Sequence, residues 1–159
     1  MDYNQFRELV VVPTLQSFRT QIPYSEEAVD LLMMTAAHES NGCSYIKQIN
    51  GPALGVYQME PSTEADIWDN YLEFNTGIEN FILYLLGDRG MGYAGVSEAL
   101  ITNLLYATAM VRVHYYRVPE ALPNTLEGLA AYAKKYYNTE LGKATAEDYL
   151  EAFKRWRDL

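Results

Sequence analysis

Residues 25–42 read SEEAVDLLMMTAAHESNG, an apolar run flanked on both sides by polar residues. Ser25 is a good N-cap, and the two glutamates after it suit the positive end of a helix dipole. The apolar run from Ala28 to Ala37 then predicts a helix that is buried on most sides. Glu39 is expected at the C-terminal end of this helix. Burial and the negative end of the dipole both raise the pKa of a carboxyl group at that position.

A carboxyl group that stays protonated near neutral pH can act as a general acid, for example towards a glycosidic oxygen. After a polar loop, the segment Gly55–Thr63 (GVYQMEPST) supplies an aromatic ring and an amide that could hold a sugar. The alternative is that Glu39 is an ordinary solvated acid at a helix end. The sequence therefore indicates a carboxyl-based glycosidase site, with that ordinary helix end as the competing interpretation.

The whole chain, residues 1–159, is expected to form one mainly α-helical domain around a central buried helix. The predicted central helix is Val96–Val118, which is apolar on nearly all sides. The stretch 41–61 contains several glycines and is expected to be loop with at most a small β-hairpin. Capping patterns predict further helix starts at Thr76, Thr125 and Thr145.

The composition argues against several classes of protein. Hydrophobic residues make up 49% of the 159 residues and charged residues 21%, which is typical of a globular domain. The net charge of −9 argues against a nucleic-acid partner, because such binding depends on Lys and Arg. No stretch approaches the roughly 20 apolar residues of a membrane span, and the first residues do not resemble a secretory signal. The single Cys43 allows no internal disulfide.

No metal site is expected from the two histidines. His38 lacks a second histidine four residues later, where the metalloprotease pattern requires one and this chain has Gly42. His114 lies in the predicted central helix and is interpreted as a core or groove residue. Most of the 14 tyrosines are expected to pack between helices, whereas Tyr57 and Tyr132 stand in specific motifs.

Three motifs resemble those of the soluble lytic transglycosylases, a branch of the lysozyme-like superfamily. They are Glu39-Ser40, then Gly55-Val56-Tyr57-Gln58 with Pro61 and Thr63, and Ala130-Ala131-Tyr132 on a later helix. The gap of 16 residues between Glu39 and Gly55 (55 − 39) is typical of that family. Longer segments, residues 51–61, 106–112 and 135–139, also resemble a group of tailed-phage virion proteins.

The resemblance implies a lysozyme-like fold and a mechanism that needs no cofactor. Glu39 would protonate the glycosidic oxygen between N-acetylmuramic acid and N-acetylglucosamine, and would then act as a base on the muramic C6 hydroxyl or on water. Ser40 would orient this acid. No second carboxylate is evident, although Glu60 and Asp66 are candidates. The implied substrate-binding residues are Ser40, Gly55, Tyr57, Gln58, Tyr132 and Tyr137. Ala133 departs from the family pattern, which has Asn there.

Two main functions fit these features, and a free cytoplasmic endolysin is a weaker third. The first is a peptidoglycan-cleaving protein of the lytic transglycosylase or muramidase type, carried in a phage virion, made without a signal peptide and acting during genome entry. Its partners would be the glycan strand and other virion proteins. The second is a structural virion or tail protein that keeps the fold with little or no activity. The intact Glu39 and Gln58 motifs favour the first function, while the net charge and Ala133 favour the second.

Overall fold

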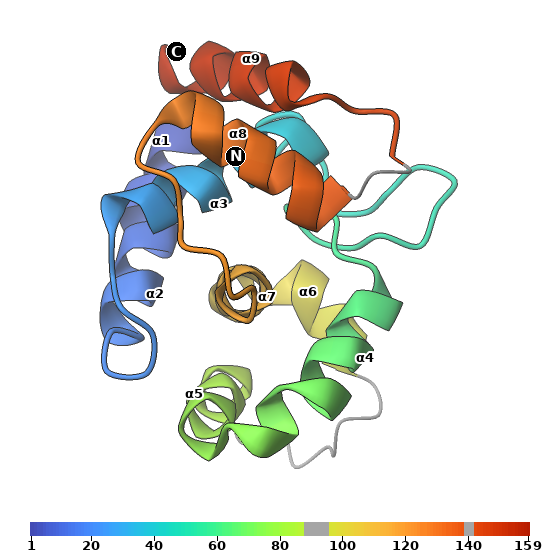
Figure 1. The fold of residues 1–159 in the computed structure, drawn as a ribbon. Helices are drawn as coiled ribbons and strands as arrows, with labels where there is room; N and C mark the ends of the chain where they lie inside the picture. The colour runs from blue at the N-terminus through green and yellow to red at the C-terminus, as the bar shows by residue number, and fades with distance from the viewer. Residues whose placement is uncertain (88–95, 139–141) are drawn as a thin grey trace.

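The structure, a computed structural model, describes residues 1–87, 96–138 and 142–159, and these residues form helices and no strand. This confirms the predicted mainly α fold class (Figure 1). The regular helices are α1 (Tyr3–Phe6), α2 (Val12–Ser17), α3 (Glu26–Glu39), α4 (Pro61–Asn70), α5 (Thr76–Leu86), α6 (Ala99–Thr102), α7 (Leu104–Tyr116), α8 (Leu126–Ala133) and α9 (Ala146–Arg157). Short π-helical or 3₁₀ segments join them: η1 (Arg7–Val11), η2 (Leu72–Phe74), η3 (Val96–Glu98) and η4 (Lys134–Asn138).

The central helix is α7, which Figure 1 shows end-on near the middle of the molecule, and it contacts α2, α3, α4, α5 and α6. All its residues from Tyr106 to Val113 are buried. The expectation of one unbroken helix over Val96–Val118 is wrong, because the chain leaves the helical conformation at Asn103 (φ −127°, ψ 96°). The side-chain oxygen of Asn103 accepts a 3.0 Å hydrogen bond from the Tyr106 N–H, so this residue starts a new helix as an N-cap.

Helix α3 forms as its capping and apolar pattern predict. The Ser25 hydroxyl accepts a 3.1 Å hydrogen bond from the Ala28 N–H, and every residue from Ala28 to Ala37 except Asp30 is buried. A helix that is apolar all round must be covered on all sides. Contacts with η1, α7, α8 and α9 supply that cover and fix the direction in which α3 ends.

The small β-hairpin considered for residues 41–61 does not form. Only two isolated bridges appear there, between Lys47 and Leu54 and between Leu54 and Met59. Asn50 and Gln58 adopt positive φ angles of 61° and 51°, which turn the chain sharply and prevent extended pairing. The segment therefore packs as an irregular loop whose end carries Gln58 back towards α3.

Two of the three predicted helix caps are confirmed and one is wrong. The Thr125 hydroxyl accepts from the Gly128 N–H, and Thr145 forms a reciprocal capping box with Asp148. Thr76 is instead the first residue of α5, because the preceding residue, Asn75, occupies the N-cap position. Asn75 makes no side-chain cap there, since its amide donates to a backbone carbonyl of the preceding turn.

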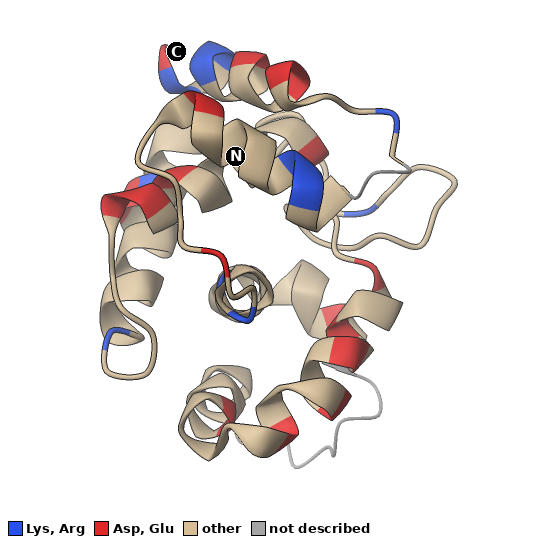
Figure 2. Ribbon diagram, viewed as in Figure 1, with Lys and Arg blue, Asp and Glu red and all other residues tan. Residues whose placement is uncertain are grey.

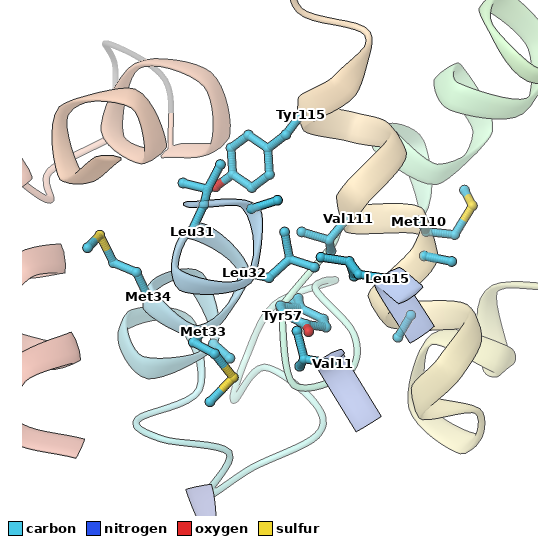
Figure 3. Packing of buried hydrophobic residues seen from close by; sticks show 14 of the residues in the cluster. Val11, Leu15, Leu31, Leu32, Met33, Met34, Tyr57, Met110, Val111 and Tyr115 are labelled. Carbon is cyan, nitrogen blue, oxygen red and sulfur yellow. The ribbon is translucent and has the colours of Figure 1, made fainter. Parts of the chain in front are cut away.

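A single hydrophobic core joins the N-terminal helices to α3 and α7. Figure 3 shows Leu15 of α2, Leu32 of α3 and Val111 of α7 directed toward one another. Tyr57, from the loop before α4, enters the same core beside Val11. Burying each of these side chains completely contributes about 1.5–3 kcal/mol, so the loop that bears Tyr57 is anchored firmly.

The charged groups are unevenly distributed over the surface. Figure 2 shows acidic positions along α4 and the turn that follows it. Helix α9 begins with acidic residues and ends with basic ones, an order that suits the helix dipole. Within the described part of the chain, no helix combines the length and apolarity needed to cross a bilayer.

Candidate active site

Glu39 is the last residue of α3, and it lines a cavity of about 720 Å³. The helix ends here because Ser40 leaves the helical conformation and the next two residues, Asn41 and Gly42, both adopt positive φ angles. Burial raises the pKa of Glu39 from its ordinary 4.5 to about 7, against the opposing effect of a hydrogen bond from Tyr149. Near neutral pH this carboxyl group is therefore divided between its protonated and ionised forms.

The Glu39 carboxyl group is held by Tyr149, which comes from α9. The Tyr149 hydroxyl donates a 2.5 Å hydrogen bond to Glu39 Oε1. Tyr149 is fully buried, and burial raises its pKa well above the usual value, so it remains a protonated donor. The His38 ring stacks on the Tyr149 ring with centroids 4.0 Å apart. Helix α9 packs along α3, and this packing keeps the donor in place.

The cavity beside Glu39 has walls of mixed chemistry, contributed by the loop 45–60, the start of α4, the end of α7 and η4. Aromatic rings offer apolar faces, and side-chain amides offer both donors and acceptors, which together suit a sugar ring. The lining residues besides Glu39 are Tyr45, Gln48, Ile49, Ala53, Gln58, Met59, Glu60, Ser62, Thr63, Asp66, His114, Arg117, Tyr136, Tyr137 and Asn138.

Gly55 and Gln58 act together to bring an amide to this cavity. Gly55 has a φ angle of +75°, and a Cβ atom on it would lie 2.1 Å from the Leu100 carbonyl oxygen, so only glycine fits against α6. Gln58 Nε2 donates a 2.8 Å hydrogen bond to the Gly55 carbonyl. Gln58 therefore lines the cavity in a fixed orientation, whereas Gly55 acts through the backbone and does not line it.

Tyr137 lines the cavity from η4. Its hydroxyl donates a 2.8 Å hydrogen bond to the Tyr57 backbone carbonyl, which ties η4 to the loop that bears Gln58. Its ring meets His114 edge-on with centroids 5.2 Å apart. This residue therefore joins two of the cavity walls.

Ser40 does not reach the cavity. It is completely buried, and its hydroxyl donates to the Ala36 carbonyl over 3.1 Å and accepts from the Cys43 N–H over 3.2 Å. Both partners are backbone groups at the end of α3. Ser40 therefore closes the helix and contacts Glu39 only as its neighbour in the chain, in contrast to the orienting role implied by the resemblance.

Tyr57 and Tyr132 also lie outside the cavity lining. Tyr57 is fully buried, and its hydroxyl shares a 3.1 Å hydrogen bond with Thr108 in the core. Tyr132 is buried on α8, and its hydroxyl donates to the Glu120 carbonyl over 2.9 Å. Ala133 is fully buried as well, so the departure at this position alters the core and not the cavity wall. In this structure the two tyrosines support the site by packing.

Sequence reasoning missed Tyr149 and also an ion pair within the cavity. Arg117 Nη1 donates to Asp66 Oδ2 over 2.6 Å, and this hydrogen bond is the main cause that lowers the pKa of Asp66. Burial lowers the pKa of neighbouring His114 to about 4, so this ring is neutral at pH 7. Asp66 and Arg117 are 51 positions apart, and no local pattern signals their pairing.

The site offers acid–base chemistry by a largely buried carboxyl group, Glu39, that lines a cavity of about 720 Å³. In the described ranges, no three His, Cys, Asp or Glu side chains lie close enough together to hold a metal ion. The chain matches no family model, no curated protein and no solved structure.

Proposed function

We propose that this protein cleaves the β-1,4 bond between N-acetylmuramic acid and N-acetylglucosamine in peptidoglycan, with Glu39 as the acid and base. One observation carries the proposal: a largely buried carboxyl group, with its pKa raised to about 7, lines a cavity of about 720 Å³ beside the amide of Gln58. A carboxyl group with these properties can donate a proton near neutral pH.

The proposed reaction begins with protonated Glu39. Its proton passes to the glycosidic oxygen as the bond between that oxygen and muramic C1 breaks, and the glucosamine end leaves as an alcohol. The resulting carboxylate then accepts the proton of the muramic C6 hydroxyl while O6 bonds to C1. This step closes a 1,6-anhydro ring and returns Glu39 to its protonated form. Attack by water in place of O6 would give hydrolysis.

One of the two other acids of the cavity, Asp66, supports the route through an anhydro ring. Asp66 is tied to Arg117 at 2.6 Å, which leaves it less available as a nucleophile or base. Glu60 is exposed at the start of α4. A two-carboxylate glycosidase instead needs its second acid free beside the reacting carbon. Tyr45, Tyr137 and the amide of Gln58 would bind the sugar rings.

The decisive experiment incubates purified protein with peptidoglycan and identifies the released muropeptides by mass spectrometry. We expect 1,6-anhydromuropeptides from the unaltered protein and none from Glu39→Gln, which keeps the shape of the side chain and loses its proton. Glu60→Gln, an acid lining the same cavity, is the matched control and should retain release. Products with reducing ends would indicate hydrolysis, and loss of activity in the control would indicate a second carboxylate.

The setting we propose is a tailed-phage virion, in which other virion proteins hold the domain against the cell wall. The competing function, a structural virion subunit without activity, is favoured by the net charge of −9 and by the acidic positions along α4 (Figure 2). Such a surface is repelled by an anionic wall unless the particle delivers it. No muropeptide release, together with detection of the protein as a component of purified particles, would support the structural function instead.

A further inference from the structure

Helix α5, at the opposite end of the molecule from α9 (Figure 1), ends in an uninterrupted apolar run, FILYLL over residues 81–86. Because successive residues of a helix point in different directions, such a run cannot be buried on one side alone. Ile78 and Ile82 point into the core and are buried. Tyr84, in contrast, is 77% exposed and Leu83 is 47% exposed. The outer side of α5 is therefore apolar as well.

The two exposed side chains form one surface with their neighbours on the helix. Residues three positions apart are adjacent on a helix surface, so Tyr84 lies beside Phe81 and Leu83 lies beside Leu86. Both Phe81 and Leu86 are only partly buried. We call these four side chains the α5 surface. Single exposed apolar residues are ordinary, whereas a contiguous group of them marks a site of interaction.

Aromatic contacts with the core hold this surface in a defined shape. The Phe81 ring stacks on the buried ring of Phe18, with centroids 4.4 Å apart and an angle of 17° between the ring planes. The Tyr84 ring in turn meets the Phe81 ring with centroids 6.4 Å apart. Tyr84 is thus supported from the inside and open on the outside. A tyrosine ordered in this way loses little conformational entropy when a partner covers it.

The part of the protein that surrounds the α5 surface is mainly acidic (Figure 2). Among the described residues of the stretch 48–111, several are Asp or Glu and none is Lys or Arg. Glu79 lies one helical turn before Leu83 on the same side of α5, and Glu73 is exposed just before the helix. No ion pair of the described residues neutralises either acid. The turn after α2 adds one exposed cation, Arg19.

This charge distribution selects among the possible partners. A second copy of the chain would bring the same acids together, and each copy carries a net charge of −9. An anionic bilayer would repel them in the same way. We propose that the α5 surface docks into an apolar groove, edged by Lys and Arg, on a different protein. Leu83 and Tyr84 would fill the groove, and Glu79 would pair with its basic edge. The proposal is independent of glycan cleavage, since none of these residues lines the cavity beside Glu39.

The probe is a fluorescent synthetic amphipathic helix of leucine and lysine, which has the apolar stripe and basic edges of the proposed partner. Fluorescence anisotropy should show saturable binding to the unaltered protein. Leu83→Ser and Tyr84→Ser should each weaken that binding about tenfold, as expected for a residue at the centre of an interface. Leu9→Ser, the same change at a leucine of η1 that is 69% exposed, is the matched control and should bind like the unaltered protein. Equal affinities of the two leucine variants would overturn the proposal, because binding would then follow the net charge alone.

Three further measurements test the charge of the partner and the other occupants. Glu79→Gln should weaken binding of the probe more than Glu151→Gln, an exposed position on α9. A peptide with glutamate in place of lysine should bind more weakly than the probe, and the opposite order would contradict the acidic edge. Self-association in sedimentation equilibrium, or flotation with phosphatidylglycerol vesicles, that is lost in Leu83→Ser would overturn the proposal in favour of a second copy or a membrane. Circular dichroism verifies that each variant is folded, and Leu83→Ser alone decides if Tyr84→Ser is not.

Discussion

Replacing Glu39 with glutamine is expected to stabilise the fold in a manner that depends on pH. The pKa of Glu39 is raised in the folded protein from 4.5 to about 7, a difference of about 2.5. Each unit corresponds to about 1.36 kcal/mol, so ionising Glu39 costs the folded state about 3 kcal/mol. An acid whose pKa is raised in the folded state makes its full contribution to the free energy of unfolding below its unfolded-state pKa, here 4.5. That contribution is lost as the pH rises through the folded-state pKa of about 7.

Glu39→Gln removes this titration, because an amide is neutral throughout the range and its oxygen can still accept from Tyr149. Urea unfolding followed by circular dichroism should give nearly equal free energies of unfolding at pH 4.5 for the two proteins. At pH 8 the variant should be more stable by about 3 kcal/mol. Glu151→Gln, which makes the same acid-to-amide change at an exposed position on α9, provides the control. If the free energies of unfolding of Glu39→Gln and the unaltered protein differ by the same amount at both pH values, the reasoning is refuted.

Three further changes test the surroundings of the site. Tyr149→Phe removes a hydrogen bond that favours the ionised form of Glu39. The pKa of Glu39 should therefore rise by about one unit, as measured by ¹³C NMR of its carboxyl group. Gly55→Ala places a Cβ atom 2.1 Å from the Leu100 carbonyl at a φ angle of +75°, and should lower the free energy of unfolding by more than about 2 kcal/mol in urea. Thr145→Ala removes the capping box of α9 and should cost about 1 kcal/mol in the same assay.

Matched controls exist for two of these changes. Gly87 has a φ angle of +73°, but a Cβ atom on it would meet nothing within 4 Å, so Gly87→Ala measures backbone strain without the close contact. Equal losses in Gly55→Ala and Gly87→Ala would show that contact with α6 is unimportant. Tyr132→Phe removes a buried tyrosine hydroxyl whose partner is a backbone carbonyl and not Glu39. A shift of the Glu39 pKa in that variant as large as in Tyr149→Phe would contradict the role given to Tyr149.

The features that sequence reasoning predicted correctly are those set by neighbours in the chain. Ser25, Thr125 and Thr145 cap helices through residues three positions away, and the apolar run of α3 specifies burial without reference to any partner. Asn103 shows the limit of that approach. Its side chain competes for a backbone N–H and divides a stretch that is apolar enough for a single long helix.

The candidate site was less predictable, because its geometry depends on distant segments. A motif gives the order of residues but not the direction of a side chain, so Ser40 and Tyr57 could not be distinguished from Gln58 as cavity residues. In the structure the first two face the backbone and the core, and only Gln58 lines the cavity. The donor to Glu39, Tyr149, lies on a helix whose own sequence pattern contains nothing that points to an acid.

Glu39 and Tyr149 are 110 positions apart in the chain, so they are not synthesised at the same time. The ribosome makes α3 long before it makes α9. Until distant segments pack around it, the glutamate is hydrated and ionised like any surface acid, because its raised pKa comes from burial in the folded protein. A partly made chain therefore has no protonated carboxyl group at this position near neutral pH, and the hydrogen bond from Tyr149 forms only after α9 has been made.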